Sequence, residues 1–314
     1  MKKALKHLKY IKSTRLGARI AKGFIKGMVL KKPVLRSVEL AITYDCNAKC
    51  DMCYSRDLLD KGRVNLGIGQ IKGIWDQAHE LGAVHVNITG GEPLLRKDIC
   101  DIIRVLRPKS TLVSIVTNAS LIDEEKMKKL KEAGLSYLQI SLDSIDPKKH
   151  DGLRKIPGLY NKVINAVELC KKYGISCCFS AVVYHGGIDD FEEIVKLAKK
   201  YDIMVLMNYV GIVGGWKTAE ELALTKDDFA RVYKLMKDPN VRFHTMYNFS
   251  GKLECPAGKE KLYITAYGDV MACNKNQIKS FGNVLKEPLK KIWDRMYNNQ
   301  EFSSYCKDCK RFNL

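Results

Sequence analysis

The sequence predicts an α/β fold in which six parallel strands, each followed by a helix, form a partial (β/α)6 barrel. Short apolar segments rich in β-branched residues alternate with longer segments of helical periodicity from residue 37 to about residue 238. Gly82, Gly134 and Gly174 follow three of the helical segments, where a left-handed residue commonly ends a helix. Strict alternation of this kind implies a parallel sheet with helices outside it.

The six units follow one another without interruption. The expected strands are residues 38–43, 84–89, 112–117, 137–142, 177–183 and 203–210. The expected helices are residues 68–81, 97–106, 123–133, 159–173, 189–199 and 226–235. Six units are too few to close an eight-stranded barrel, but ligands should still bind on the loops that follow the strands.

A basic segment, residues 1–36, precedes the barrel. Twelve lysines and arginines come before the first acidic residue, Glu39, and the chain has a net charge of +19. Apolar residues recur near helical intervals among these lysines, with a break near residues 13–17, which predicts a basic amphipathic helix. Such a helix can lie on an anionic membrane, pack on the barrel, or bind nucleic acid, and the apolar content makes nucleic acid the least favoured of the three.

A third region, residues 239–314, begins where the alternation stops. It contains a short hairpin pattern at residues 262–273 and a helical segment near residues 288–297. We therefore divide the chain into a basic N-terminal helical segment (1–36), a barrel (37–238) and a small appended domain (239–314).

Composition limits the class of protein. The chain has 314 residues, of which 46% are hydrophobic and 28% charged, and it contains no run of about 18 apolar residues that could span a bilayer. The N-terminus lacks the pattern of a secretory signal, so we expect a cytoplasmic protein that can associate peripherally with a membrane. In that compartment the clustered cysteines among the eleven are better interpreted as metal ligands than as disulfides, whereas Cys100, Cys170, Cys177 and Cys178 are expected to be thiols of the core.

Three cysteines form the first candidate site. Cys46, Cys50 and Cys53 lie within eight residues, directly after the first strand. A four-iron cluster needs soft thiolate ligands, and three of them leave one iron open for chemistry. A zinc site with a distant fourth ligand is the alternative, although no histidine lies within this loop.

The loop after the second strand reads Gly90-Gly91-Glu92-Pro93. Two glycines allow close approach of the main chain, Glu92 can accept a hydrogen bond from an ammonium, and Pro93 fixes the turn. Together with the CxxxCxxC spacing, this tetrapeptide resembles the radical S-adenosylmethionine (SAM) superfamily, which has a TIM-like partial barrel. The resemblance implies a SAM-binding [4Fe-4S] cluster on the three cysteines, and SAM held by the GGEP-like loop.

Thr117 and Asn118, after the third strand, are similar to a threonine–asparagine step of that family. Ala119 and Ser120 stand where the family commonly has glycine. The resemblance implies that Thr117 and Asn118 contact SAM, and a plain turn is the alternative.

Ser141 and Asp143, at the end of the fourth strand, resemble family positions whose polar side chains meet the ribose of SAM. Arg154 resembles an arginine that pairs with the methionine carboxylate, a task that suits a bidentate guanidinium. Surface or turn roles are the alternatives for all three.

A second cysteine set comprises Cys255, Cys273, Cys306 and Cys309. Four thiolates complete a [4Fe-4S] cluster without an open iron, and a zinc ribbon is the alternative. The surrounding sequence resembles the auxiliary-cluster extension called SPASM or twitch. Full SPASM domains carry seven cysteines, so four indicate the shorter twitch type with a second, auxiliary [4Fe-4S] cluster.

The resemblance implies a radical SAM oxidoreductase or maturase. Such an enzyme cleaves SAM reductively to a 5′-deoxyadenosyl radical, which abstracts a hydrogen atom from the substrate. We expect the auxiliary cluster to accept an electron during oxidation of, or bond formation on, a small molecule, lipid or peptide. A ferredoxin or flavodoxin would suit the basic surface as reductant. The alternatives are a radical SAM enzyme that modifies RNA and a non-catalytic, cysteine-rich metal-binding protein.

Overall fold

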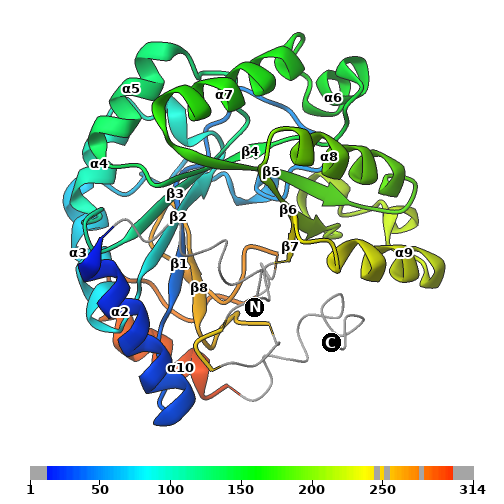
Figure 1. Ribbon diagram of the computed structural model, residues 1–314. Helices are drawn as coiled ribbons and strands as arrows, with labels where there is room; N and C mark the ends of the chain where they lie inside the picture. The colour runs from blue at the N-terminus through cyan, green and yellow to red at the C-terminus, as the bar shows by residue number, and fades with distance from the viewer. Residues whose placement is uncertain (1–12, 244–247, 251–254, 276–278, 300–314) are drawn as a thin grey trace.

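The computed structural model describes residues 13–243, 248–250, 255–275 and 279–299. Its centre is a single nine-stranded sheet in the order β7-β6-β5-β4-β3-β2-β1-β8-β9, curved into an open barrel (Figure 1). All neighbouring strands are parallel except the last pair, β8 and β9. The strands are β1 Ser37–Thr43, β2 His85–Gly90, β3 Leu112–Thr117, β4 Tyr137–Ser141, β5 Ser176–Val183, β6 Met204–Tyr209, β7 Val241–Phe243, β8 Lys261–Ile264 and β9 Val270–Met271.

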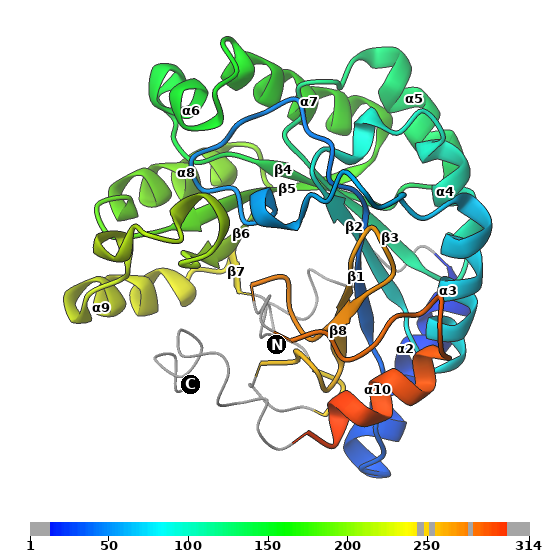
Figure 2. The ribbon, with the colours of Figure 1, turned by 180° about the vertical axis from the view of Figure 1, so that it is seen from behind.

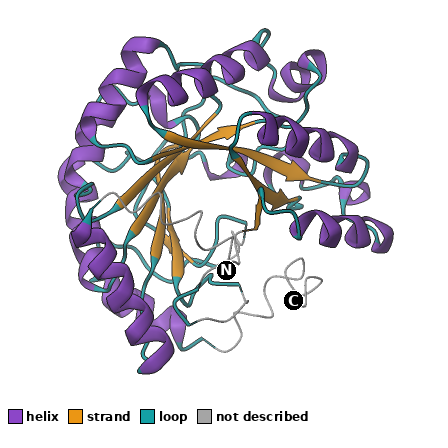
Figure 3. Ribbon diagram, viewed as in Figure 1, coloured by secondary structure: helices purple, strands orange, loops and turns teal. Residues whose placement is uncertain are grey.

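Helices cover the outer face of this sheet (Figure 3). In the described residues the α-helices are α2 Thr14–Phe24, α3 Ile68–Glu80, α4 Ile99–Val105, α5 Glu124–Ala133, α6 Pro147–Arg154, α7 Leu159–Tyr173, α8 Ile188–Lys200, α9 Lys226–Met236 and α10 Leu289–Tyr297. The predicted fold class, a partial barrel of alternating strands and helices, is confirmed.

The core lies between the strands and the surrounding helices. Fully buried side chains such as Trp75 of α3, Phe179 of β5 and Phe191 of α8 belong to one continuous apolar cluster. Each buried side chain of this size stabilises the fold by about 1.5 to 3 kcal/mol relative to exposure, before entropy is counted. The parallel strands are mostly buried, as expected for strands with helices on one face and a filled interior on the other.

The helix ends follow the sequence. Gly82, Gly134 and Gly174 have positive φ angles of 111°, 97° and 62°, as the prediction of left-handed helix ends requires. At the other end of α5, the Asp123 carboxylate accepts a hydrogen bond from the backbone N–H of Lys126 at 2.7 Å. These local signals explain why the predicted helix bounds agree closely with the observed ones.

The sheet is longer than the six strands that the sequence predicts. β7 pairs in parallel with β6 beyond residue 238, and β8 pairs in parallel with β1. The first strand of the C-terminal hairpin therefore continues the barrel sheet. The division of the chain into domains remains a prediction.

The N-terminal helix lies against the barrel wall. Ser13 has an extended backbone and α2 begins at Thr14, within the predicted break of residues 13–17; the stretch before the break, residues 1–12, lies outside the described residues. Leu16 is buried, and Ile20 and Phe24 pack with it around Phe249. The Arg19 guanidinium donates to the carbonyls of His79 and Ala83 at the end of α3, at 2.7 and 3.0 Å. Within the described part of the chain, no helix is both long and apolar enough to span a bilayer.

Candidate functional site

The first cysteine set lies on the loop that follows β1. Cys46, Cys50 and Cys53 all line one cavity of about 370 Å³ inside the barrel. The lining of this cavity reaches from Ser37, at the start of β1, to the cysteine loop beyond the end of that strand. The three predicted ligands thus face a common space at the C-terminal ends of the strands, as the barrel geometry predicts.

Burial disfavours the thiolate form of Cys46 and Cys50 when no metal is bound. Burial raises the pKa of Cys46 to about 11, and the neighbouring Glu92 and the other two cysteines raise it further. Burial also raises the pKa of Cys50, against the opposing effect of the Arg154 guanidinium. Metal binding at these thiols would therefore release protons.

Gly90, the last residue of β2, and Gly91, which follows it, allow a close contact with the backbone at the end of β1. A Cβ on Gly90, which has a φ of +132°, would lie 1.9 Å from the Thr43 carbonyl oxygen, and one on Gly91 would lie 2.2 Å from that of Asp45. The Gly91 N–H donates to the Thr43 carbonyl at 2.8 Å, and the Glu92 N–H donates to the Asp45 carbonyl at 2.9 Å. These contacts fix the start of the cysteine loop against the end of β2. Both glycines also line the cavity.

Glu92 is a buried carboxylate at the cavity wall, 1% exposed. It accepts hydrogen bonds from the Leu94 N–H at 3.1 Å, the Thr117 hydroxyl at 2.8 Å and the Asn118 N–H at 2.8 Å. Burial raises its pKa, although these bonds oppose the rise. Pro93 is buried and begins the short 3-10 helix Pro93–Leu95, which supplies the first of the three donors.

Side chains after β3 hold the cysteine loop from another side. The Asn118 amide donates to the Asn47 side-chain oxygen at 3.0 Å, and the Asn47 amide donates to the Ser120 hydroxyl at 2.8 Å. Ala119 has a φ of +65° and is fully buried, so the turn keeps the backbone conformation that glycine would adopt more easily. Thr117 and Asn118 also line the cavity.

Arg154 and Asp143 form a buried ion pair. The Arg154 Nε donates to Asp143 Oδ2 at 2.6 Å, and the two side chains are 13% and 0% exposed. Burial lowers the pKa of Arg154, but Asp143 and Cys50 more than offset this effect, so the pKa is raised. Arg154 Nη1 lies 3.8 Å from the Cys50 sulfur, and Arg154 and Ser141 line the cavity. The pairing of Arg154 with Asp143 is not foreseen by the sequence.

A second glycine pair, Gly214 and Gly215, supports the cysteine loop and is missed by the sequence analysis. A Cβ on Gly214, which has a φ of +59°, would lie 2.1 Å from the Cys53 carbonyl oxygen, and one on Gly215 would lie 2.0 Å from that of Asp51. The Gly215 N–H donates to the Cys53 carbonyl at 2.8 Å. A pair of adjacent glycines four residues beyond the sixth predicted strand was the signal that could have found them.

Polar side chains line the middle of the barrel. Asn87, Gln139 and Asn208 face the cavity together with Thr89 and Ser141. They also bond to one another and to their neighbours: Gln139 donates to Asn87 at 2.9 Å, and Asn208 donates to Ser180 at 3.0 Å. The interior is therefore a pre-ordered, polar surface.

The second cysteine set is only partly within the described residues. Cys273 lines the same cavity as the first set, whereas Cys255 lines a separate cavity near the start of β8. Burial raises the pKa of Cys273, and Lys261 opposes the rise. Cys306 and Cys309 lie outside the described residues. In the described ranges no three Cys, His, Asp or Glu side chains are grouped so that they could hold a single metal ion.

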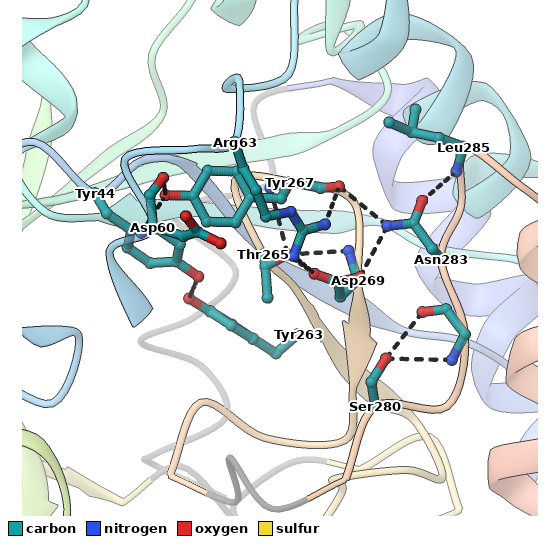
Figure 4. A network of polar contacts seen from close by, with 11 residues as sticks. Tyr44, Asp60, Arg63, Tyr263, Thr265, Tyr267, Asp269, Ser280, Asn283 and Leu285 are labelled. Carbon is teal, nitrogen blue, oxygen red and sulfur yellow. Dashed lines mark hydrogen bonds and ion pairs between the residues drawn. The ribbon is translucent and has the colours of Figure 1, made fainter. Parts of the chain in front are cut away.

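A polar network anchors the hairpin that precedes Cys273 (Figure 4). The Arg63 guanidinium donates to Asp269 at 2.6 Å and lies over the Tyr267 ring, and the Asn283 amide donates to Asp269 at 2.8 Å. The Tyr267 hydroxyl donates to the Asp60 carbonyl and accepts from its N–H. The network joins the segment that follows the cysteine loop to the turn between β8 and β9.

The residues around the cavity suit an iron–sulfur cluster with SAM. Three thiols on one loop supply soft ligands for three irons of a four-iron cluster and leave the fourth iron open. The buried Glu92 carboxylate can accept from an ammonium, and the Arg154 guanidinium can bind a carboxylate. The donor set and the charges therefore match both groups.

Comparison with known families agrees with this geometry. The Radical SAM superfamily matches residues 40–198, and the SPASM family, described as an iron–sulfur cluster-binding domain, matches residues 255–310. The first family binds a [4Fe-4S] cluster and SAM, and the second binds auxiliary iron–sulfur clusters.

Individual relatives have different named activities. The chain is 21% identical over 295 residues to the PqqA peptide cyclase of Rhizobium meliloti (strain 1021), which covers 86% of this chain and 78% of that protein. It is 30% identical over 207 residues to the probable GTP 3',8-cyclase of Archaeoglobus fulgidus, which covers 63% of this chain and 69% of that protein.

The fold is similar to that of Streptococcus suis SuiB in its crystal structure with the precursor peptide SuiA. The TM-score is 0.70 at 19% sequence identity, over 90% of this chain and 69% of SuiB. At this identity the likeness concerns the fold alone.

Proposed function

Because the chain belongs to the Radical SAM superfamily, with a SPASM domain, we propose that it is a maturase-type oxidoreductase that oxidises or cross-links a peptide side chain in the barrel cavity. One observation carries the proposal: a single cavity is lined both by the three cysteines of the first set and by Cys273 of the second. A substrate bound there would lie between the two metal sites. An electron released during oxidation would then have a short path to the second site.

The groups bound at the first cysteine set supply, when present, one-electron cleavage of a carbon–sulfur bond and a radical that removes a hydrogen atom. The residues of the chain bind and orient. Glu92 would accept a hydrogen bond from the amino group of SAM. Thr117 and Asn118 would hold the Glu92 carboxylate in place. Arg154, oriented by Asp143, would bind the SAM carboxylate.

Ser141 would contact the ribose, and Gly90, Gly91 and Pro93 would keep the loop close to SAM. Gly214 and Gly215 would fix Cys53 from the opposite side of its loop. The amides of Asn87, Gln139 and Asn208 would bind the substrate by exchanging their present hydrogen bonds, which join Gln139 to Asn87 and Asn208 to Ser180.

Two relatives support a peptide substrate. One is named a peptide cyclase, and the structural neighbour SuiB was solved with a precursor peptide. A polar small molecule is the second candidate, favoured by the 30% identity to a probable GTP 3',8-cyclase and by the polar lining of the cavity.

The same proposal includes one auxiliary [4Fe-4S] cluster on Cys255, Cys273, Cys306 and Cys309. It includes an acidic ferredoxin or flavodoxin as reductant, since the chain carries a net charge of +19. Peripheral contact with a membrane is a further part, and nucleic acid is not expected as a partner.

The test is anaerobic reconstitution followed by iron and 5′-deoxyadenosine assays on wild type, Cys53→Ala and Cys273→Ala. Wild type should hold about eight irons per chain, as expected for two four-iron clusters. Cys53→Ala should lose about half of the iron and all deoxyadenosine formation. Cys273→Ala should lose auxiliary iron but still cleave SAM. Cys100→Ala, a thiol outside both sets, is the control and should match wild type.

The substrate class is tested by adding synthetic peptides or GTP to the wild-type assay. Stimulation of deoxyadenosine formation by peptides, with a mass change in the peptide that Cys273→Ala does not produce, would support the proposal. Stimulation by GTP alone would favour the second candidate. A zinc-loaded protein that forms no deoxyadenosine with any reductant would overturn both.

A further inference from the structure

The N-terminal helix is divided into a part whose apolar side chains pack on the barrel and an end whose large apolar side chains are exposed, although Gly27 in that end still approaches the Phe249 backbone. Leu16, Ile20 and Phe24 of α2 pack around Phe249, and a Cβ on Gly23 would lie 2.3 Å from the Phe249 ring. The apolar stripe of α2, one candidate for membrane contact in the sequence, is therefore used in folding.

The end of the helix differs sharply. The π-helical turn η1, Ile25–Val29, contains no buried residue. The side chains of Ile25, Met28, Val29 and Leu30 are 56%, 52%, 71% and 55% exposed. We refer to these four residues as the apolar tip. In the rest of the described chain, exposed large apolar side chains are scattered, whereas these four fall within six residues.

Basic side chains surround the apolar tip. Lys22, Lys26, Lys31 and Lys32 lie within the same stretch, and no acidic residue precedes Glu39. Three of the four lysines are exposed and Lys26 is half-buried. None of them forms an ion pair with another residue of the described ranges. The tip therefore combines exposed apolar surface with charge of a single sign.

We propose that the apolar tip inserts into the surface of an anionic membrane while the four lysines contact lipid headgroups. Contiguous exposed apolar residues need a partner, and a basic rim selects an anionic one. Each lysine near an anionic bilayer adds about 1 kcal/mol. The apolar side chains supply the part of the binding that salt does not screen.

The other partners explain less of this surface. A stable protein interface buries about 800 Å² on each side, which is more than a single exposed helical turn offers. Nucleic acid would use the lysines but would gain little from four aliphatic side chains. A lipid surface needs no complementary shape. Both views place the C-terminal end of α2 at the periphery of the molecule, beside α10 (Figures 1 and 2).

Docking at the tip would orient the barrel. The tip precedes Ser37, where β1 begins, whereas the cysteine loop follows Thr43, where β1 ends. The N-terminal ends of the strands would face the lipid, and the cysteine loop would face away from it. This inference does not depend on the proposed reaction, and its test uses no turnover assay as evidence of binding.

The experiment is vesicle co-sedimentation of the full, reconstituted chain, with phosphatidylcholine alone or mixed with phosphatidylglycerol, at low and high salt. The triple variant Ile25→Ser, Val29→Ser and Leu30→Ser removes apolar surface without changing the charge. It should lower binding to the anionic vesicles by about tenfold or more. The matched control, Leu59→Ser, Val64→Ser and Leu285→Ser, changes three comparably exposed side chains elsewhere and should bind like wild type.

A second variant replaces Lys22, Lys26, Lys31 and Lys32 by glutamine. It should bind more weakly and lose most of the salt dependence, because fewer charges contact the lipid. Thermal unfolding and deoxyadenosine formation should be unchanged in both variants, which separates this inference from the proposed reaction. If wild type binds no anionic vesicles, or if the tip variant binds as tightly as wild type, the inference is wrong.

Discussion

The two cysteine-bearing regions of this protein are built in opposite ways. The first is a short loop after β1, held by contacts from the ends of neighbouring strands. Its charged groups are buried: Glu92 is 1% exposed, and the Asp143 side chain is fully buried against Arg154. In the second, around Cys273, the turn of the hairpin is held by Arg63 and Asp269, whose side chains are 39% and 22% exposed.

The difference indicates how each region depends on its surroundings. Around the first loop, removal of one partner of a hydrogen bond or ion pair leaves a buried donor or charge unpaired. The folded protein is then strongly destabilised. Around the hairpin, water can replace a lost partner, so single changes should cost little and should depend on salt. Three substitutions test this contrast, from the largest expected effect to the smallest.

Asp143→Asn should have the largest effect on stability. It removes the negative charge beside Arg154 and leaves a buried guanidinium with a neutral acceptor. We expect the free energy of unfolding to fall by about 2 to 4 kcal/mol. Urea unfolding measures the change. Asp101→Asn, which removes an exposed pairing with Arg104, is the control and should cost less than about 0.5 kcal/mol.

If Asp143→Asn lowers the free energy of unfolding by as little as the control does, Arg154 is solvated in the folded protein. The first region then does not depend on a buried ion pair.

Glu92→Gln should have a smaller effect on stability and a large one on SAM affinity. The amide nitrogen of glutamine would face one of the donors that now reach Glu92, so we expect a stability loss of about 1 to 3 kcal/mol. The lost charge should weaken SAM binding by about a hundredfold, equivalent to about 2.7 kcal/mol. Calorimetric titration of the reconstituted protein measures the affinity.

Glu80→Gln, at the exposed end of α3, is the matched control and should bind SAM like wild type. Unchanged affinity in Glu92→Gln would remove Glu92 from the SAM site and leave it with a structural role only.

Local patterns explain why most of the fold could be predicted. The first six strands and their helices follow from alternating apolar segments and from glycines such as Gly134, because these signals act within a few residues. β7 was missed because three residues give no periodicity. The pairing of β8 with β1 joins segments more than 200 residues apart, and no local pattern encodes it.

The candidate site was predicted in its parts but not in its connections. The motif residues indicated the cysteine loop and the loop after β2. The close approach of Gly90 to Thr43, and of Gly214 to Cys53, depends on how the loops pack in three dimensions. The same holds for Arg154, whose partner Asp143 lies eleven residues earlier, on the loop after β4.

The smallest effect is expected for Asp269→Asn in the network of Figure 4. Burial raises the pKa of Asp269, but hydrogen bonds from Arg63 and Asn283 outweigh it, so the pKa is lowered. A lowered carboxyl pKa stabilises the folded protein above the ordinary value of about 4 and ceases to do so as the pH falls through the folded value. At neutral pH the variant should therefore lose about 0.5 to 1 kcal/mol, and less at high salt.

The informative measurement for this variant is local, because the hairpin leads directly into Cys273. Weaker anchoring of the turn between β8 and β9 should let a chelator remove iron from the second site faster than it does in wild type. Iron loss from the first site and deoxyadenosine formation should be unchanged. Asp294→Asn, in an exposed helical pair with Lys290, is the control and should not change the rate of iron loss. Equal rates of iron loss in Asp269→Asn and in the control would mean that the surface network does not hold the second region. The contrast between the two regions would then depend only on the buried charges around the first.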